Sequence, residues 1–137
     1  MNKVEKAKAK FEASFGKGFF EVVPVKTFKG KKSEASFYQN MTVNVNMTGF
    51  DEADVFHEAA HAMDELMFDS QMEFAMFFRP FYSEFKKMKY FREFAAQYES
   101  KYQPSEVFAE AVAMAVANPQ WEAGQKFAEA VRARLKP

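Results

Sequence analysis

The first third of the chain carries alternating helix-like and strand-like patterns of hydrophobic positions. Residues 3–15 have apolar side chains three and four positions apart, which predicts a short amphipathic helix. The stretch 19–28 is rich in Val and Phe and predicts a strand, in which Pro24 indicates an edge or a bulge. Residues 36–39 and 41–47 predict further strands. In 41–47, hydrophobic residues alternate strictly with polar ones, as in a half-buried strand.

From residue 51 onward the pattern is almost wholly helical. Either Asp51 or Thr48 is positioned to cap the first helix of this part. We expect helices over 51–68, over 70–98 with an interruption near Arg79-Pro80, from Pro104 to Asn118-Pro119, and over 120–135. The many phenylalanines of the 70–98 stretch are spaced for core packing rather than for a substrate groove. No linker or repeat divides the chain, so the sequence predicts one α+β domain over 1–137, with a small N-terminal sheet and a mainly helical C-terminal part.

Composition and charge support a globular protein and narrow its partners. Of the 137 residues, 48% are hydrophobic, which is incompatible with a disordered segment. The formal net charge is zero, so the whole chain favours no polyanionic partner. Residues 1–32 hold nine lysines against three glutamates, a local charge of +6. We interpret this segment as a solvated lysine face rather than a nucleic-acid arm, and expect no nucleic-acid partner.

The chain contains no cysteine, which excludes disulfides, thiolate metal ligands and a cysteine nucleophile. Its N-terminus is too charged for the apolar core of a signal peptide. No apolar run approaches the roughly 18 residues of a membrane span, so no membrane partner is expected. We therefore expect a cytoplasmic protein, with secretion by another route left open. The sequence does not indicate an oligomeric state.

The most informative segment is His57-Glu58-Ala59-Ala60-His61, which contains the only two histidines of the chain. On a helix, residues four apart lie on the same face, so both imidazoles can reach one metal ion. Glu58 then lies beside the metal without being required as a ligand. That position suits a carboxylate that takes a proton from a zinc-activated water. The alternative is a pair of exposed helical histidines with no metal.

A catalytic zinc ion needs a third protein ligand and an open position for water. With no further histidine and no cysteine, that ligand must be a carboxylate. The metzincin pattern is excluded, because its glycine and its third ligand would fall on Asp64 and Met67. The best candidates are Glu106 and Glu110, which are four apart on one predicted helix. One can bind zinc while the other supports a histidine by a hydrogen bond to its second ring nitrogen.

These motifs, His-Glu-x-x-His-x-x-Asp at 57–64 and Glu-x-Phe-Ala-Glu at 106–110, resemble those of the gluzincin domain of anthrax lethal factor and the related Pro-Pro endopeptidases. The resemblance covers about residues 41–117. It implies a compact zincin-like fold and zinc-dependent hydrolysis of peptide bonds in a protein or peptide substrate. It also implies one zinc ion per chain and roles for six residues: ligands His57, His61 and Glu106, general base Glu58, and supporting residues Glu110 and Asp64.

The chain departs from that family at three positions. Ala60 stands where the family usually has glycine, and Val107 stands where it has phenylalanine. The family also carries a tyrosine seven residues before the ligand glutamate, which would help to stabilise the oxyanion, and this position is Glu99 here. Tyr98 is the first alternative donor and Tyr102 the second.

Two alternative functions remain open at this point. One is a zinc-binding but catalytically weak or inactive zincin-like module with a binding or regulatory role, of phage or mobile-element origin. The other is a peptidase that cleaves a repressor, as in the phage-immunity family with a similar motif helix, whose later glutamate lies closer to the motif. For an active peptidase, we expect the 41–47 strand to end the sheet and to form one wall of a cleft, where an extended peptide could add as a further strand.

Overall fold

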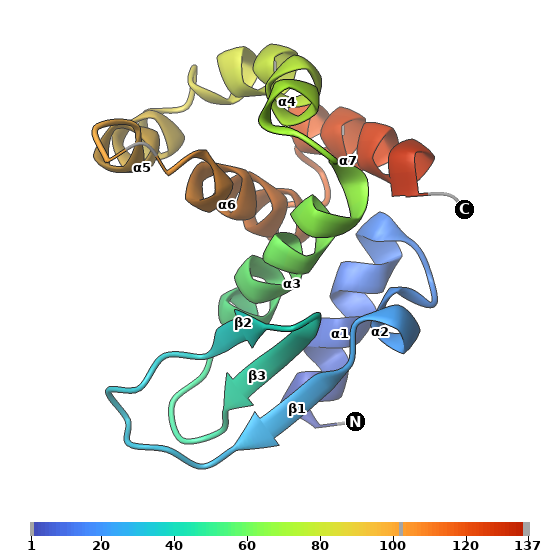
Figure 1. Cartoon of the computed structure of the whole chain (residues 1–137), viewed down its shortest axis with the longest axis vertical. Helices are drawn as coiled ribbons and strands as arrows, with labels where there is room; N and C mark the ends of the chain where they lie inside the picture. Colours follow the sequence, from blue (N-terminus) through green and yellow to red (C-terminus); the bar gives the residue numbers. More distant parts are fainter. Residues whose placement is uncertain (1, 102, 136–137) are drawn as a thin grey trace.

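The computed structural model describes residues 2–101 and 103–135. Within these ranges the chain is α+β and mostly helical, with seven helices and a three-stranded sheet (Figure 1). The elements are α1 Lys3–Phe15, α2 Phe19–Val22, β1 Val25–Phe28, β2 Phe37–Gln39, β3 Thr42–Asn46, α3 Glu52–Met67, α4 Gln71–Phe85, α5 Lys89–Glu99, α6 Pro104–Ala117 and α7 Glu122–Leu135. No helix in the described ranges has both the length and the apolar character needed to cross a membrane.

The sheet has the order β1-β3-β2, with β3 in the centre, parallel to β1 and antiparallel to β2. The predicted half-buried strand is confirmed as β3, whose Val43 and Val45 are completely buried. The expectation that this strand ends the sheet is wrong, because β2 pairs beside it and forms the edge. A two-residue turn, Asn40-Met41, joins β2 to β3, and both residues have positive φ, 50° and 58°, as in a type I′ hairpin.

The strand predicted over 19–28 forms only at its end, as β1, and its first four residues form α2 instead. The carboxylate of Glu12 explains this difference, because it accepts hydrogen bonds from the backbone N–H groups of Gly18 (3.1 Å) and Phe20 (3.2 Å). These bonds satisfy donors that a first helical turn leaves free. The ring of Phe20 also packs 5.4 Å from that of Phe11. Burial and capping therefore favour a helical turn over an extended strand.

The predicted interruption at Arg79-Pro80 is also wrong. Helix α4 continues through Pro80, and the chain leaves the helix only after Phe85. A proline inside a helix removes one hydrogen bond, but apolar side chains on both sides of Pro80 pack into a common core and offset that loss. The rings of Phe77, Phe78, Phe81 and Phe85 all lie 5.3–6.5 Å from the ring of Phe127 on α7. The expectation that this aromatic stretch packs in the core is confirmed.

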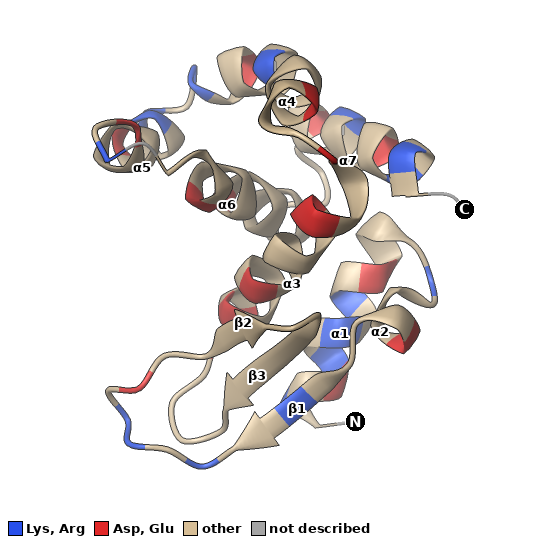
Figure 2. Ribbon diagram, viewed as in Figure 1, with Lys and Arg blue, Asp and Glu red and all other residues tan. Residues whose placement is uncertain are grey.

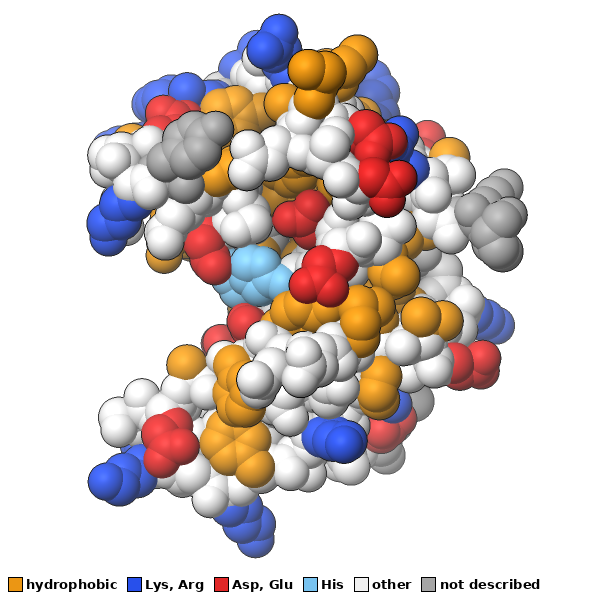
Figure 3. Space-filling view, viewed as in Figure 1, with side chains coloured by type: hydrophobic (Ala, Val, Ile, Leu, Met, Phe, Trp, Pro, Cys, Tyr) orange, Lys and Arg blue, Asp and Glu red, His pale blue; other side chains and the backbone are white. Residues whose placement is uncertain are grey.

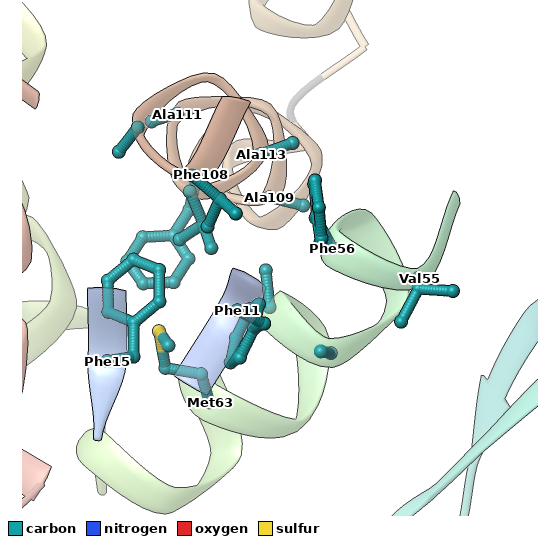
Figure 4. Close-up of a cluster of buried hydrophobic side chains, with 14 of the residues drawn as sticks. Phe11, Phe15, Val55, Phe56, Met63, Phe108, Ala109, Ala111 and Ala113 are labelled. Carbon is teal, nitrogen blue, oxygen red and sulfur yellow. The ribbon is translucent and has the colours of Figure 1, made fainter. Parts of the chain in front are cut away.

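The centre of the core lies where α1, α3 and α6 meet (Figure 4). Large side chains from α1 and α3, such as Phe11 and Met63, fill the space against α6. Alanines such as Ala60 on α3 and Ala109 on α6 are completely buried, so the two helices can approach closely. Helix α6 is apolar on nearly all sides, as expected of a helix in the interior. This packing fixes α3 and α6, which carry the candidate site, relative to each other.

The charged residues of the N-terminal segment are dispersed. Figure 2 shows the lysines of residues 2–32 spread over α1, β1 and the connection between β1 and β2 rather than gathered in one stripe. One of them, Lys10, lies 2.7 Å from the carboxylate of Glu52 at the start of α3. These lysines therefore do not form a single face.

Candidate metal centre

Helix α3 holds the two histidines on its exposed side. Its N-terminus is fixed by a capping box in which Asp51 and Asp54 each accept a backbone hydrogen bond from the other end of the turn. The opposite side of the helix is buried in the core. His57 and His61 are consequently half-buried, with 24% and 18% of their side chains exposed. Figure 3 shows histidine surface at the bottom of a hollow across the middle of the molecule, with acidic side chains around it.

Helix α6 brings Glu106 to both histidines. The Nε2 atom of His57 lies 2.8 Å from Oε2 of Glu106, and the Nε2 atom of His61 lies 3.2 Å from Oε1. The structure therefore brings together the three side chains that were predicted as ligands, although Glu106 follows His61 by 45 residues and His57 by 49. Pro104, at the first position of α6, starts this helix as predicted.

The spacing of these atoms can be compared with the needs of a zinc ion. Ligands at about 2.0–2.2 Å from a tetrahedral zinc lie about 3.3 Å from one another. The distances of 2.8 and 3.2 Å are close to this separation, and they fit a hydrogen-bonded cluster as well. Burial lowers the pKa of His61, against the opposing effect of Glu106. A lowered pKa favours the neutral imidazole, which is the form that binds metal. The arrangement is therefore compatible with an ion and equally with a metal-free hydrogen-bonded cluster, in which each histidine contacts a different oxygen of Glu106.

Glu58 lies beside this cluster. Single donor atoms of His57, Glu58 and His61 all lie within 4.8 Å of one another. Burial raises the pKa of Glu58 to about 7, with further contributions from the negative charges of Glu106 and Asp54 and an opposing one from His57. A carboxylate with a pKa near neutrality exchanges a proton readily at physiological pH. Glu58 therefore lies within reach of the same space as the ring nitrogens of the two histidines.

Of the two tyrosines predicted to stabilise the oxyanion, one can be located in the structure. Tyr98 lines the same hollow of about 530 Å³ as His57, Glu58 and Glu106, so it is on the correct side of the site for its predicted role. Its ring packs 4.9 Å from that of Phe94. Tyr102 lies outside the described residues.

Glu110 also lines this hollow, but its partner differs from the predicted histidine. Its carboxylate accepts a hydrogen bond from the hydroxyl of Tyr90 at 3.1 Å, and in the ranges described it has no hydrogen bond to either histidine. Asp64 lies one turn beyond His61 and lines a separate hollow with Ser105. Burial, followed by the charge of Glu65, raises the pKa of Asp64 to about 6. Its predicted support of the site is accompanied by no hydrogen bond of its carboxylate to another described residue.

Sequence reasoning missed Tyr38, on strand β2. Its ring stacks beside that of His61, with 6.5 Å between centroids and 25° between planes. Its hydroxyl donates to the carboxylate of Glu65 at 2.8 Å. A signal was present: in a two-residue hairpin Tyr38 pairs with Val43, and cross-strand partners share a face. Because Val43 is buried against α3, Tyr38 had to face the same helix.

Comparisons with protein-family models, with curated proteins and with solved structures found no match to this chain.

Proposed function

We propose that this chain is a zinc-dependent endopeptidase of the gluzincin type, with a zincin-like arrangement of one sheet and two ligand-bearing helices. One observation carries the proposal: the Nε2 atoms of His57 and His61 lie 2.8 and 3.2 Å from the two carboxylate oxygens of Glu106. This convergence joins two helices that are distant in sequence, and Glu58 stands beside it.

The residues divide the chemistry among them. His57, His61 and Glu106 would hold one zinc ion, which when bound polarises a peptide carbonyl and makes water more acidic. The carboxylate of Glu58 accepts the proton of the attacking water and passes it to the nitrogen of the leaving amine. Tyr98, which lines the same hollow, would donate a hydrogen bond to the carbonyl oxygen as that oxygen gains negative charge.

The substrate is a peptide in an extended conformation. Strand β2 is an edge of the sheet, so one side of its backbone is unpaired within the sheet. Its Tyr38 stacks beside His61, while the central strand β3 lines the hollow through Asn46. An extended peptide can pair with such an edge by main-chain hydrogen bonds. This arrangement would hold a peptide bond across the hollow. The residues that line the hollow would then determine which substrate side chains are accepted.

A second function is favoured by one observation. Position 99, which is tyrosine in the family that the motifs resemble, is Glu99 here, and its carboxylate is paired with Lys86 at 3.2 Å. If Tyr98 does not supply the missing donor, the chain would bind zinc and act as a binding or regulatory module with weak peptidase activity or none. The origin of such a module in a phage or mobile element is part of this second proposal.

The test begins with metal analysis of the purified chain, for which we expect one zinc per chain. Activity is then measured on a peptide library with and without a chelator. Glu58→Gln should keep the zinc and lose at least 100-fold in turnover, since it removes the proton acceptor. Glu93→Gln, an exposed position on α5 outside the hollow, is the matched control and should behave as wild type.

The outcomes separate the two functions. Zinc binding without cleavage of any library member would favour the binding module. A chain that cannot be loaded with zinc at all would rule out both functions. Full activity in Glu58→Gln would remove this residue as the base.

A further inference from the structure

Asn46, the last residue of β3, has a polar side chain that is almost fully buried, with 2% of the residue exposed. All four hydrogen-bonding positions of its amide are filled. Its Oδ1 atom accepts from the backbone N–H groups of Gly30 (3.1 Å) and Thr48 (3.0 Å). Its Nδ2 atom donates to the carbonyl oxygens of Lys31 (2.8 Å) and Glu34 (2.9 Å). Three of these four partners lie in the connection between β1 and β2, so one side chain fixes the shape of that connection.

The part of this connection that Asn46 holds, residues 30–36, is called the 30–36 loop below (Figure 1). Five of its residues line the hollow of the candidate metal centre: Lys32, Ser33, Glu34, Ala35 and Ser36. The loop also packs closely against the chain before α3, because a Cβ added to Gly49 would lie 3.3 Å from the Cγ atom of Lys32. The loop therefore forms one wall of the hollow, and Asn46 holds that wall from inside.

The same network leaves the backbone of Ala35 without a partner strand. Phe37 pairs with Asn44 in the antiparallel ladder of β2 and β3, so an extended ladder would set Ala35 opposite Asn46. The N–H of Asn46 instead donates to the hydroxyl oxygen of Ser36 at 3.0 Å. Among the described residues, neither the N–H nor the carbonyl oxygen of Ala35 has a hydrogen-bond partner. Both groups are therefore available where the edge strand β2 approaches the hollow.

We propose that the 30–36 loop binds the backbone of the peptide substrate, and that Asn46 is the positioning residue that holds the loop in place. This inference rests on the proposed peptidase function. An extended peptide that pairs with the edge of β2 would continue past Ala35, whose N–H and carbonyl oxygen would each form one main-chain hydrogen bond with it. Asn46 acts through the loop, since its own amide is fully bonded to the chain.

The test compares Asn46→Asp with wild type on a long and a short peptide. Aspartate keeps both acceptor bonds but loses the two N–H donors that hold the loop. For the long peptide we expect KM to rise about tenfold with kcat nearly unchanged, because binding is lost and the reacting groups are not altered. For the shortest peptide that wild type still cleaves, which does not reach the loop, KM should stay the same. The affinity for zinc should also stay the same.

Asn44→Asp is the matched control. Asn44 lies two residues earlier on β3, its amide donates to the carbonyl oxygen of Thr42 at 3.3 Å, and it does not line the hollow. This variant should keep the KM of wild type for both peptides. A second variant, Ala35→Pro, removes the available N–H from the loop at an exposed position and leaves Asn46 in place. It should raise KM for the long peptide alone.

The outcomes separate this inference from the proposed function. An unchanged KM for the long peptide in Asn46→Asp, or an equal rise for both peptides, would overturn the positioning role while the peptidase function stands. A wild type that cleaves no peptide would overturn the proposed function and this inference with it. Circular dichroism checks the folding of each variant. If Asn46→Asp does not fold, Ala35→Pro decides, and an unchanged KM for the long peptide in that variant would overturn the role of the loop.

Discussion

The hydroxyl of Tyr38 donates a hydrogen bond to the carboxylate of Glu65 at 2.8 Å, and this bond joins the edge strand β2 to helix α3 one turn beyond His61. Burial and Glu65 raise the pKa of Tyr38 to about 12, so the hydroxyl stays protonated and remains a donor at physiological pH. Glu58, His61 and Glu65 follow one another along one side of α3, and Tyr38 contacts the last two through its ring and its hydroxyl.

A double-mutant cycle measures this bond. Tyr38→Phe and Glu65→Ala should each lower the free energy of unfolding, and their coupling should be about 0.5–1.5 kcal/mol in urea denaturation of the metal-free chain. In an active peptidase, Tyr38→Phe should raise KM more than it lowers kcat, because β2 is held less firmly while the ligands are unchanged. A coupling energy of zero would mean that the bond does not stabilise the strand.

Removal of the third ligand should weaken zinc binding. Glu106→Gln keeps the shape of the side chain but loses its charge, so we expect the affinity for zinc to fall by about tenfold to 100-fold. Competition with a chromogenic chelator measures this affinity. Glu122→Gln on α7, which is exposed, is the matched control and should leave the affinity unchanged.

The same metal should stabilise the folded chain. In wild type, zinc at 100 times its Kd should raise the free energy of unfolding by about 2.7 kcal/mol. At the same zinc concentration, the increase for Glu106→Gln should be much smaller. Equal stabilisation of both proteins would place the ion elsewhere.

Asp64 gives a prediction about pH. Its pKa in the folded chain is raised from 3.8 to about 6, so the folded state binds the proton more tightly than the unfolded state does. Its stabilising contribution is fully present below pH 3.8 and is lost as the pH rises through 6. Asp64→Asn has no such charge to bury. The stability of metal-free wild type, measured by urea denaturation, should therefore fall relative to Asp64→Asn between about pH 4 and 6.5, and parallel curves would contradict this assignment.

Pro80 is expected to weaken the helix that contains it. It lies inside α4 at an exposed position, where proline removes a backbone hydrogen bond. Pro80→Ala should raise the free energy of unfolding by about 1–2 kcal/mol, since part of the gain is offset by a more flexible unfolded chain. Ser83→Ala, also exposed on α4, should change stability much less. Thermal melting followed by circular dichroism measures both variants, and a lower stability of Pro80→Ala would show that the proline is needed for the shape of α4.

The sequence predicted those parts of the fold that depend on local periodicity and on strong end signals. The capped start of α3 and the proline-led start of α6 are both confirmed. The errors at 19–22 and at Pro80 arose where distant contacts decide the outcome. A carboxylate from α1 caps α2, and Phe127 from α7 holds the two halves of α4 together.

In the candidate site, too, local spacing could be predicted from the sequence and contacts between distant elements could not. The spacing of His57 and His61 placed two imidazoles on one side of a helix, and elimination of other ligands pointed to a carboxylate such as Glu106. The partner of Glu110 could not be predicted, because Tyr90 reaches it from another helix, α5. Tyr38 was missed because its place depends on pairing between strands, which the pattern within 36–39 does not reveal.

The length of the turn at Asn40-Met41 determines which face of β2 carries Tyr38. Side chains alternate between the two faces of a strand, so one residue added to this turn, with pairing shifted by one position, would rotate Tyr38 to the opposite face. The aromatic ring would then leave His61, and the backbone of β2 would present a different set of donors and acceptors to an incoming peptide. In the proposed peptidase, the length of this loop alone would change how a substrate aligns, although the loop contains none of the proposed zinc ligands.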